Sequence, residues 1–338
     1  MRRLAVILSG LLAVQVAGAV ALAVTGPDYG AFKPSEPLVA FDPAAVQEIS
    51  IDAGKKEGEE EAVVLRREGE GWTLPGLYGF PADDDKVAKL MENLAGLKRG
   101  LPVATSGAAL ERFKVTEESH ERRIVLNGGD GTLGEVLIGT SPSFRQVHAR
   151  TPEDDVVFSV AFETYEAGTR ADDWMDRQVL HIPEEEIERI VLPTVTLARA
   201  EDKFVVEGLG EGEEANAEAV SNLVDKIARL SFSTVEGKGE EALARLAEPA
   251  LTVTVERKEA PAVTLRLAKL DGEEDYLLAS STQNYLFRAA KYAVQPLVDA
   301  KREGLVKAAQ AKPKSSISEK QGGGTQAGEE AADKDGSG

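Results

Sequence analysis

One short segment of the chain places a tryptophan between acids and arginines. Its charged and aromatic residues are Arg170, Asp172, Asp173, Trp174, Asp176 and Arg177. An indole ring beside charged groups could stack on a ligand that those groups orient. A tryptophan can equally fill the interface between two parts of a protein, because it buries a large apolar area. We mark Trp174, Asp173 and Arg177 as candidate binding or interface residues, and we favour the interface.

Carboxylates elsewhere in the chain allow two further kinds of chemistry. Asp83, Asp84 and Asp85 could ligate a calcium ion, but they directly precede an apolar run of helical period. Acids at that place cap a helix and interact with its dipole, so we predict capping. Two acids facing each other across a cleft could also hydrolyse a glycosidic bond. The sequence does not select a pair among its 58 acidic residues, and a carboxylate-based hydrolase is a remote alternative.

The sequence lacks the signatures of several other catalytic classes. It has no cysteine, which excludes disulfides, thiolate metal sites and a cysteine nucleophile. It contains neither the phosphate-binding pattern G-x-x-x-x-G-K-[ST] nor the nucleophile turn G-x-S-x-G. The histidines, His120, His148 and His181, lack metal-ligand spacing, and we expect them to be isolated at the surface or at strand edges. We predict no catalytic residue, no cofactor and no metal site, and therefore a protein that is not an enzyme.

The elements that would position these residues occur twice. The same apolar spacing is found at an offset of 133 residues, in Val87, Leu90, Met91, Leu94, Ala95 and Leu97 and in Val220, Leu223, Val224, Ile227, Ala228 and Leu230. Recurrence at every third or fourth residue predicts an amphipathic helix in each copy. Asp83 and Asn216 precede these helices as caps.

Strands flank each predicted helix. Before the helices we predict strands at 46–51, 63–66 and 72–74, and at 187–192, 196–198 and 204–206. After each helix, alternating apolar residues predict a meander of about four strands, with a hairpin turn at 127–131 in the first copy. Short helices at 161–167 and 289–297 close the copies. The predicted fold class is α+β: two tandem homologous repeats, 44–182 and 183–306, each a mostly antiparallel sheet with one main amphipathic helix and a short closing helix.

The N-terminal segment predicts where the protein resides. Leu4 to Val24 form an apolar run, and at about 1.5 Å per residue this run can span a bilayer core of roughly 30 Å as a helix. Arg2 and Arg3 favour a cytoplasmic N-terminus and export of the rest. We predict a signal anchor at 1–25 in a bacterial inner membrane, crossing once, with the bulk of the chain on the periplasmic or extracytoplasmic side. A cleaved signal peptide is the competing interpretation.

Composition completes the predicted organisation. A proline-containing spacer at 26–43 follows the anchor, and a disordered tail at 307–338 is rich in Gly, Ala, Ser, Lys and Glu. The chain carries 39 basic and 58 acidic residues, for a formal net charge of −19. Such a body repels phosphate backbones, so we predict that it has no nucleic-acid partner.

The segment closing the first repeat resembles the central stretch of a bacterial family defined by a domain of unknown function, numbered 4340. The resemblance rests on Arg170, Asp172, Asp173, Trp174, Met175, Asp176, Arg177, Val179, Leu180, Ile182, Pro183, Glu186, Ile187 and Ile190. Trp72, Leu74, the helix with Leu90, Leu94 and Leu97, and the L-x-x-F of Leu110 and Phe113 stand in the family's order; Phe113, Lys114 and Val115 replace its usual Y-G-L. The resemblance covers about residues 40 to 306. It implies a membrane-anchored exported protein related to auxiliary subunits of gliding-motility-type ABC transporters, and it implies no catalytic residues.

These observations favour a non-enzymatic scaffold. We expect it to contact the membrane through its N-terminal helix and to bind an envelope or transporter protein. The alternative is a ligand-binding module for envelope glycans or small solutes, with its groove between the repeats.

Overall fold

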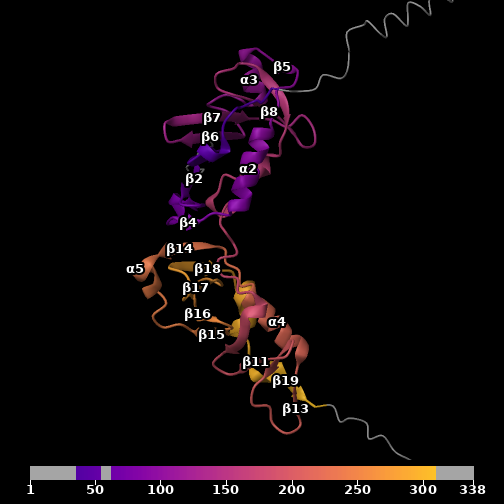
Figure 1. The fold of residues 1–338 in the computed structure, drawn as a ribbon, viewed down its shortest axis with the longest axis vertical. Coiled ribbons are helices and arrows are strands. Elements are labelled where there is room, and N and C mark those ends of the chain that lie inside the picture. Colours follow the sequence, from indigo (N-terminus) through magenta and orange to yellow (C-terminus); the bar gives the residue numbers. More distant parts are fainter. Residues whose placement is uncertain (1–35, 55–61, 310–338) are drawn as a thin grey trace, which may run out of the picture.

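The computed structural model of this 338-residue chain describes residues 36–54 and 62–309 (Figure 1). The predicted anchor at 1–25, residues 26–35 of the spacer and residues 310–338 of the tail lie outside these ranges. Within the described ranges, no helix combines the length and the apolar character needed to cross a bilayer.

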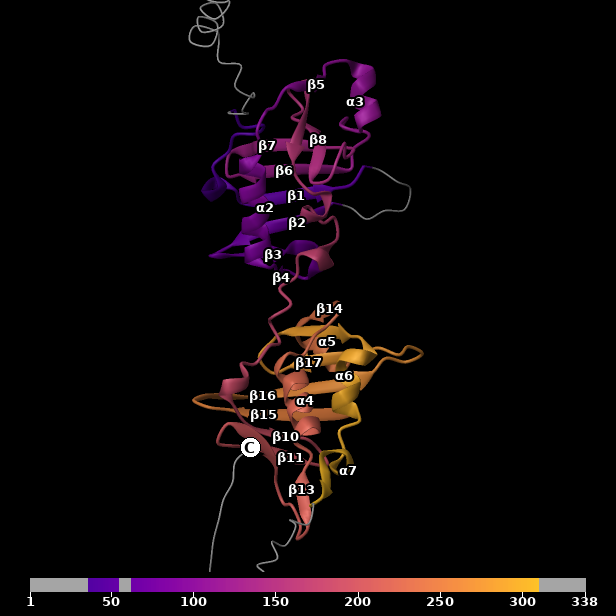
Figure 2. The same cartoon turned by 90° about the vertical axis from the view of Figure 1, so that its right-hand side faces the viewer.

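The first sheet has nine strands in the order β4-β3-β2-β1-β6-β7-β8-β9-β5. They are β1 (Glu48–Asp52), β2 (Val63–Glu68), β3 (Gly71–Leu74), β4 (Phe80–Pro81), β5 (Pro102–Ala104), β6 (Arg122–Gly128), β7 (Gly131–Ile138), β8 (Gln146–Arg150) and β9 (Val157–Ala161). All of the pairings are antiparallel. Helix α2 (Asp84–Gly96) lies across one face of the sheet (Figure 2), and α3 (Gly107–Phe113) lies near the β5 end. We call this sheet with its two helices unit 1.

The second sheet has eight strands in the order β12-β11-β10-β15-β16-β17-β18-β14. They are β10 (Ile187–Val191), β11 (Thr196–Ala200), β12 (Lys203–Val206), β14 (Thr234–Lys238), β15 (Leu251–Arg257), β16 (Ala260–Lys269), β17 (Tyr276–Ser280) and β18 (Tyr285–Ala289). Its helices are α4 (Ala217–Ala228), α5 (Gly239–Ala244), α6 (Lys291–Val298) and α7 (Arg302–Leu305). A small antiparallel pair, β13 (Glu213–Ala215) and β19 (Val306–Ala308), completes what we call unit 2.

The two sheets have the same strand order. When β1, β2, β3 and β5 to β9 are matched in turn with β10, β11, β12 and β14 to β18, the two orders coincide, and β4 is an addition to unit 1. In both units, the strand that follows the main helix crosses over to pair with the last strand of the meander.

Local expectations about the main helices are confirmed. The Asp83 side chain accepts a hydrogen bond from the Lys86 amide at 3.1 Å, and Asn216 caps α4 through the Ala219 amide. Most residues of the predicted apolar stripes are buried, with Val87 and Val224 fully inaccessible, while Met91 and Ala95 are half-buried. The mixed, mostly antiparallel fold class and the hairpin turn between β6 and β7 are also confirmed.

The core shows how the helices cover the sheets. One apolar cluster continues through both units, with α2 and α4 packed on it. A smaller cluster that includes Leu110 and Val157 lies under α3, and another that includes Leu246 and Leu286 lies under α5. The small helices therefore cover a second face of each sheet at its β5 or β14 end.

Three details differ from the sequence prediction. The closing helix at 161–167 is wrong: Ala161 ends β9, and only the 3-10 turn η3 (Thr164–Glu166) follows. Strands β5 and β14 were not predicted: β5 has three residues and little burial, and β14 has few apolar residues in its sequence TVEGK. Strand β19 includes Lys307 and Ala308, which the prediction assigned to the tail.

Candidate functional site

The segment between the two sheets, residues 162–183, is the linker, and it binds both units. On unit 1, Met175 forms a bridge with Ala82, and the Trp174 carbonyl accepts a hydrogen bond from the Asp83 amide at 2.7 Å. On unit 2, the Ile182 amide donates to the Ala228 carbonyl at 2.8 Å. The linker is thus fixed by backbone contacts in its middle and at its C-terminal end.

Arg177 connects the linker to unit 2. Its guanidinium donates to the backbone carbonyls of Phe232 and Ser233 at 2.7 and 2.8 Å, and to that of Asp172 at 2.9 Å. The group also lies over the Phe232 ring, 5.4 Å from its centre. The hydroxyl of Thr234 donates to the Asp172 carboxylate at 2.9 Å, which adds a second contact between the linker and β14.

Trp174 is buried, with 3% of its surface exposed. Its indole N–H donates to the Gly168 carbonyl at 2.8 Å. Gly168 itself approaches Asp173 so closely that an added Cβ would lie 2.6 Å from the Asp173 Cβ. The structure therefore packs the indole inside a tight turn of the linker.

Asp173 stabilises the start of the same turn. Its carboxylate accepts a hydrogen bond from the Arg170 amide at 3.2 Å, at the beginning of the 3-10 turn η4 (Ala171–Asp173). Its backbone carbonyl accepts from the Lys86 ammonium at 3.3 Å. The three candidate residues thus come together around one turn between the units.

An aromatic cluster joins the edges of the two sheets beside the linker. The Phe80 ring of β4 meets the rings of Phe232, Tyr285 and Phe287 edge-on, at centre distances of 5.7, 4.9 and 6.0 Å. The Tyr285 hydroxyl donates to the Gly79 carbonyl at 2.9 Å. Such edge-on pairs add about 0.5–1.5 kcal/mol each to the burial of the rings. The junction therefore has an apolar centre and a hydrogen-bonded border.

A cavity of about 810 Å³ opens beside α2 and the linker, which we call the α2 groove. Its walls are formed by Lys86, Lys89, Leu90, Asn93, Arg122, Tyr165, Glu166, Gly168, Thr169, Arg170, Asp172, Asp173, Trp174 and Arg177. All of these residues belong to unit 1 or to the linker, so the groove lies to one side of the junction. Five of them are cationic and three are acidic, although the chain as a whole carries a charge of −19.

The acids of the α2 groove are already engaged with neighbouring groups. Glu166 accepts from the Asn93 amide side chain at 2.9 Å and from the Glu163 backbone amide at 3.3 Å. Arg177 is bound to backbone carbonyls, while three of the other cations form ion pairs, Lys86 with Asp83 at 3.5 Å, Lys89 with Glu92 at 2.7 Å and Arg170 with Asp172 at 3.2 Å. The lining still holds five cations against three acids, an excess of positive charge that is suited to an anionic ligand.

The predicted capping role of the aspartates before α2 is confirmed. Asp83 caps the helix, and Asp84 accepts from the Trp72 amide at 2.8 Å, which ties α2 to β3. In the part of the chain that the structure describes, no three side chains of His, Asp or Glu are grouped so that they could hold a metal ion.

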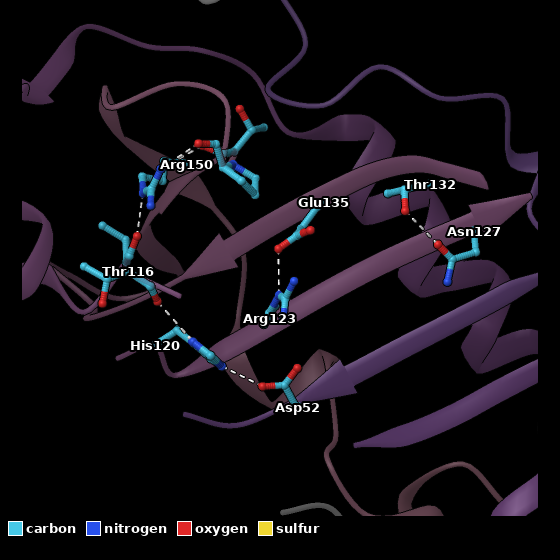
Figure 3. Close-up of polar contacts among 11 residues, drawn as sticks. Asp52, Thr116, His120, Arg123, Asn127, Thr132, Glu135 and Arg150 are labelled. Carbon is cyan, nitrogen blue, oxygen red and sulfur yellow. Dashed lines mark hydrogen bonds and ion pairs between the residues drawn. The ribbon is translucent and has the colours of Figure 1, made fainter. Parts of the chain in front are cut away.

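Unit 1 contains a buried polar network that the sequence did not reveal (Figure 3). His120 is 8% exposed, and its ring nitrogens lie 2.7 Å from the Asp52 carboxylate and 3.1 Å from the Thr116 carbonyl. Arg150 is 6% exposed and donates to the Val115 carbonyl at 2.5 Å. The expectation of isolated histidines at the surface or at strand edges is wrong for His120, because its partner Asp52 lies 68 residues away in the sequence and meets it only in the folded sheet.

His148, on β8, is the second buried histidine. It is 6% exposed, its ring lies 4.1 Å from that of Phe113, and Thr140 Oγ1 is 2.9 Å from its Nδ1. Burial lowers the pKa of His148 below its ordinary value of 6.5, and the nearby Arg112 lowers it further, against the opposing effect of Thr140. The neutral imidazole is therefore the form that this site favours.

Comparison with known proteins gives one family. The family described as "Domain of unknown function (DUF4340)" matches residues 72–249, from β3 of unit 1 through α5 of unit 2. The match is narrower than the resemblance over about residues 40 to 306, but it includes every residue on which that resemblance rests. None of the curated proteins and none of the solved structures matches the chain.

Proposed function

The chain belongs to the DUF4340 family, matched over more than half of its 338 residues, and from this premise we propose that it is a membrane-anchored, non-enzymatic scaffold. It would lie on the extracytoplasmic side of a bacterial inner membrane and bind another envelope protein, as an accessory to an ABC-type transporter or a related complex. Its two units would be homologous repeats produced by duplication, which the shared strand order supports.

The junction between the units is the observation that carries this proposal. A scaffold must hold its binding surfaces in one orientation, and this requires more than a flexible connection. Here Arg177 binds two carbonyls of unit 2 while Trp174 and Met175 bind unit 1. The aromatic cluster around Phe80 adds an apolar contact between the sheets. The candidate residues of the linker thus serve to fix the two units relative to each other.

Cross-linking in native membranes tests the scaffold. The full chain would carry a photoreactive residue in place of Tyr292, which is 79% exposed on α6 of unit 2, or in place of Phe144, which is 82% exposed in unit 1. We expect at least one position to cross-link to the permease subunit of a transporter or to another protein with an extracytoplasmic part. The cross-link should weaken in Phe80→Ala, which loosens the junction. A series of exposed positions over both units that gave no protein adduct would contradict the proposal.

The α2 groove favours a second candidate function, the binding of an anionic envelope glycan or a small anionic solute. Its support is the excess of positive charge in an 810 Å³ cavity of an acidic protein. Calorimetric titration with acidic and neutral oligosaccharides of the same length would test it. We expect only the acidic compounds to bind, and the double variant Lys86→Gln, Lys89→Gln to reduce their affinity severalfold.

Lys226 provides the matched control for this titration. It lines the corresponding groove beside α4, where two lysines face two aspartates. Lys226→Gln should leave acidic oligosaccharide binding unchanged. Equal losses in both variants would indicate a general charge effect and would exclude the α2 groove as the site.

A further inference from the structure

Exposed apolar side chains gather at the end of unit 1 that lies farthest from unit 2. Leu101 and Val103 lie on or next to β5 and are 66% and 43% exposed, and Phe144, just before β8, is 82% exposed. Tyr165, just after β9, is 73% exposed. Strands β8, β9 and β5 are the last three in the order of the sheet, and Figure 2 places β5 at the far end of the molecule.

Contacts between β8, β9 and the residues before β5 place these side chains around one part of the sheet. Ser159 of β9 donates to the Gln146 side chain of β8 at 2.8 Å, and a Cβ at Gly100 would lie 3.7 Å from the Ser159 carbonyl. Leu101 and Phe144 therefore flank the same stretch of β9. The Tyr165 hydroxyl and the Arg145 guanidinium both contact the Glu163 carboxylate, at 2.8 and 3.4 Å. We call Leu101, Val103, Phe144 and Tyr165 the apolar end.

The equivalent end of unit 2 is covered. Strand β14 corresponds to β5 in the shared strand order, and the ring of Phe232 just before it packs against Phe80 of unit 1. Lys238 of β14 donates to the Tyr78 carbonyl at 3.3 Å. The β14 end of unit 2 therefore packs against unit 1. The apolar end is the corresponding surface of the first unit.

The path of the chain indicates what lies next to the apolar end. The Glu36 carbonyl accepts from the Arg99 amide at 2.8 Å, and Pro37 forms a bridge with Lys98. The described chain thus begins within a few residues of Leu101. Residues 25–35 separate this point from the apolar run that ends at Val24, and eleven residues reach at most about 40 Å. With that run in a bilayer, the apolar end is the part of the described protein tethered closest to it.

We propose that the apolar end lies against the surface of the bilayer that holds the anchor; this rests on the anchor of the proposed function. Tethering gives this surface a high effective concentration of lipid, so a few apolar side chains suffice for contact. Phenylalanine, leucine and tyrosine side chains partition into the interfacial region of a bilayer. The net charge of −19 opposes binding to anionic lipid, so the contact is with zwitterionic lipid.

Spin labelling of the full chain in phosphatidylcholine vesicles tests the proposal. The natural chain has no cysteine, so Phe144→Cys and Tyr292→Cys each give a single label. These two positions are almost equally exposed, at 82% and 79%, but lie on different units. We expect the label at 144 to be severalfold more accessible to oxygen, relative to a water-soluble nickel chelate, than the label at 292. Leu101→Cys should behave like Phe144→Cys.

Two results would overturn the inference in different ways. Labels at 144 and 101 that are as accessible to the nickel chelate as the label at 292 would place the apolar end in water. Labels shielded from both oxygen and nickel would place it against protein, as in a second copy of the chain. Retention of the chain in the vesicles after an alkaline wash is measured in the same samples. Loss of the chain at that step would refute the anchor itself, and the inference with it.

Discussion

The two units share a strand order but differ in how they end. In unit 2, α6 packs beside α4 and buries Ala293, Val294 and Leu297. In unit 1, the corresponding residues belong to the linker and form its turns η3 and η4. The α2 groove of about 810 Å³ is the space left beside the helix, compared with about 390 Å³ beside α4.

This difference shows that the same framework uses its closing segment in two ways. A closing segment that folds back as a helix completes the core of its own unit. A closing segment that does not form a helix can bind the next unit, but it leaves the main helix of its own unit less covered. The candidate residues Asp173, Trp174 and Arg177 lie in the closing segment of unit 1, which binds unit 2 and does not form a closing helix.

Removing the Phe80 ring should have the largest effect on how the two units unfold, because this ring is the part of unit 1 that packs against the edge of unit 2. Phe80→Ala should lower the free energy of unfolding by about 3–5 kcal/mol, through lost burial and a cavity at the junction. Urea unfolding followed by tryptophan fluorescence reports unit 1 and the linker, because Trp72 and Trp174 lie there. Circular dichroism reports both units. We expect the two curves to separate in the variant.

Phe204→Ala is the matched control. It removes a phenylalanine that is 7% exposed on β12, at the opposite edge of unit 2. This variant should also be less stable, but its two unfolding curves should stay together. Coincident curves in Phe80→Ala, with a loss below about 1 kcal/mol, would mean that the aromatic cluster does not couple the units.

Arg177→Ala should have the next largest effect. It leaves the carbonyls of Asp172, Phe232 and Ser233 without their donor, at a cost of about 2–3 kcal/mol for a charged group with several partners. Arg170→Ala removes an arginine of the same turn whose side chain is 68% exposed, and the change should stay within about 1 kcal/mol. Thermal unfolding of the two variants measures the contrast. Equal losses would show that Arg177 is no more than a surface charge.

Protonation of His148 should have the smallest effect on stability, and the effect should be confined to unit 1. Its pKa is lowered in the folded state, so the unfolded chain binds a proton more readily below its ordinary pKa of 6.5. Stability is therefore unaffected above that pH and falls as the pH drops through 6.5 toward the lower folded value. Unfolding at pH 7 and pH 5 measures this loss. His148→Gln should reduce it, and an unchanged pH dependence would show that other groups cause it.

Much of the fold follows from local patterns in the sequence. The stripe of Val87, Leu90 and Leu94 predicts α2 because burial on one face of a helix requires that spacing, and Asp83 predicts where the helix begins. Alternation in β6 and β7 predicts a hairpin for a similar reason. The repeated apolar spacing also predicted two sheets of one kind, because the same spacing of buried residues favours the same elements in each copy.

Only the tertiary structure decided which distant segments pair or pack with one another. Strand β5 has three residues and little burial, so its pairing with β9 depends on contacts far away in the chain. The burial of Trp174, the partners of His120 and the α2 groove likewise depend on segments that meet only after folding. Periodicity records which face of an element is apolar, but not which distant segment will cover it. For this protein, that distinction separates the main helices and the antiparallel strands, which the sequence determined, from the junction and the groove, which it did not.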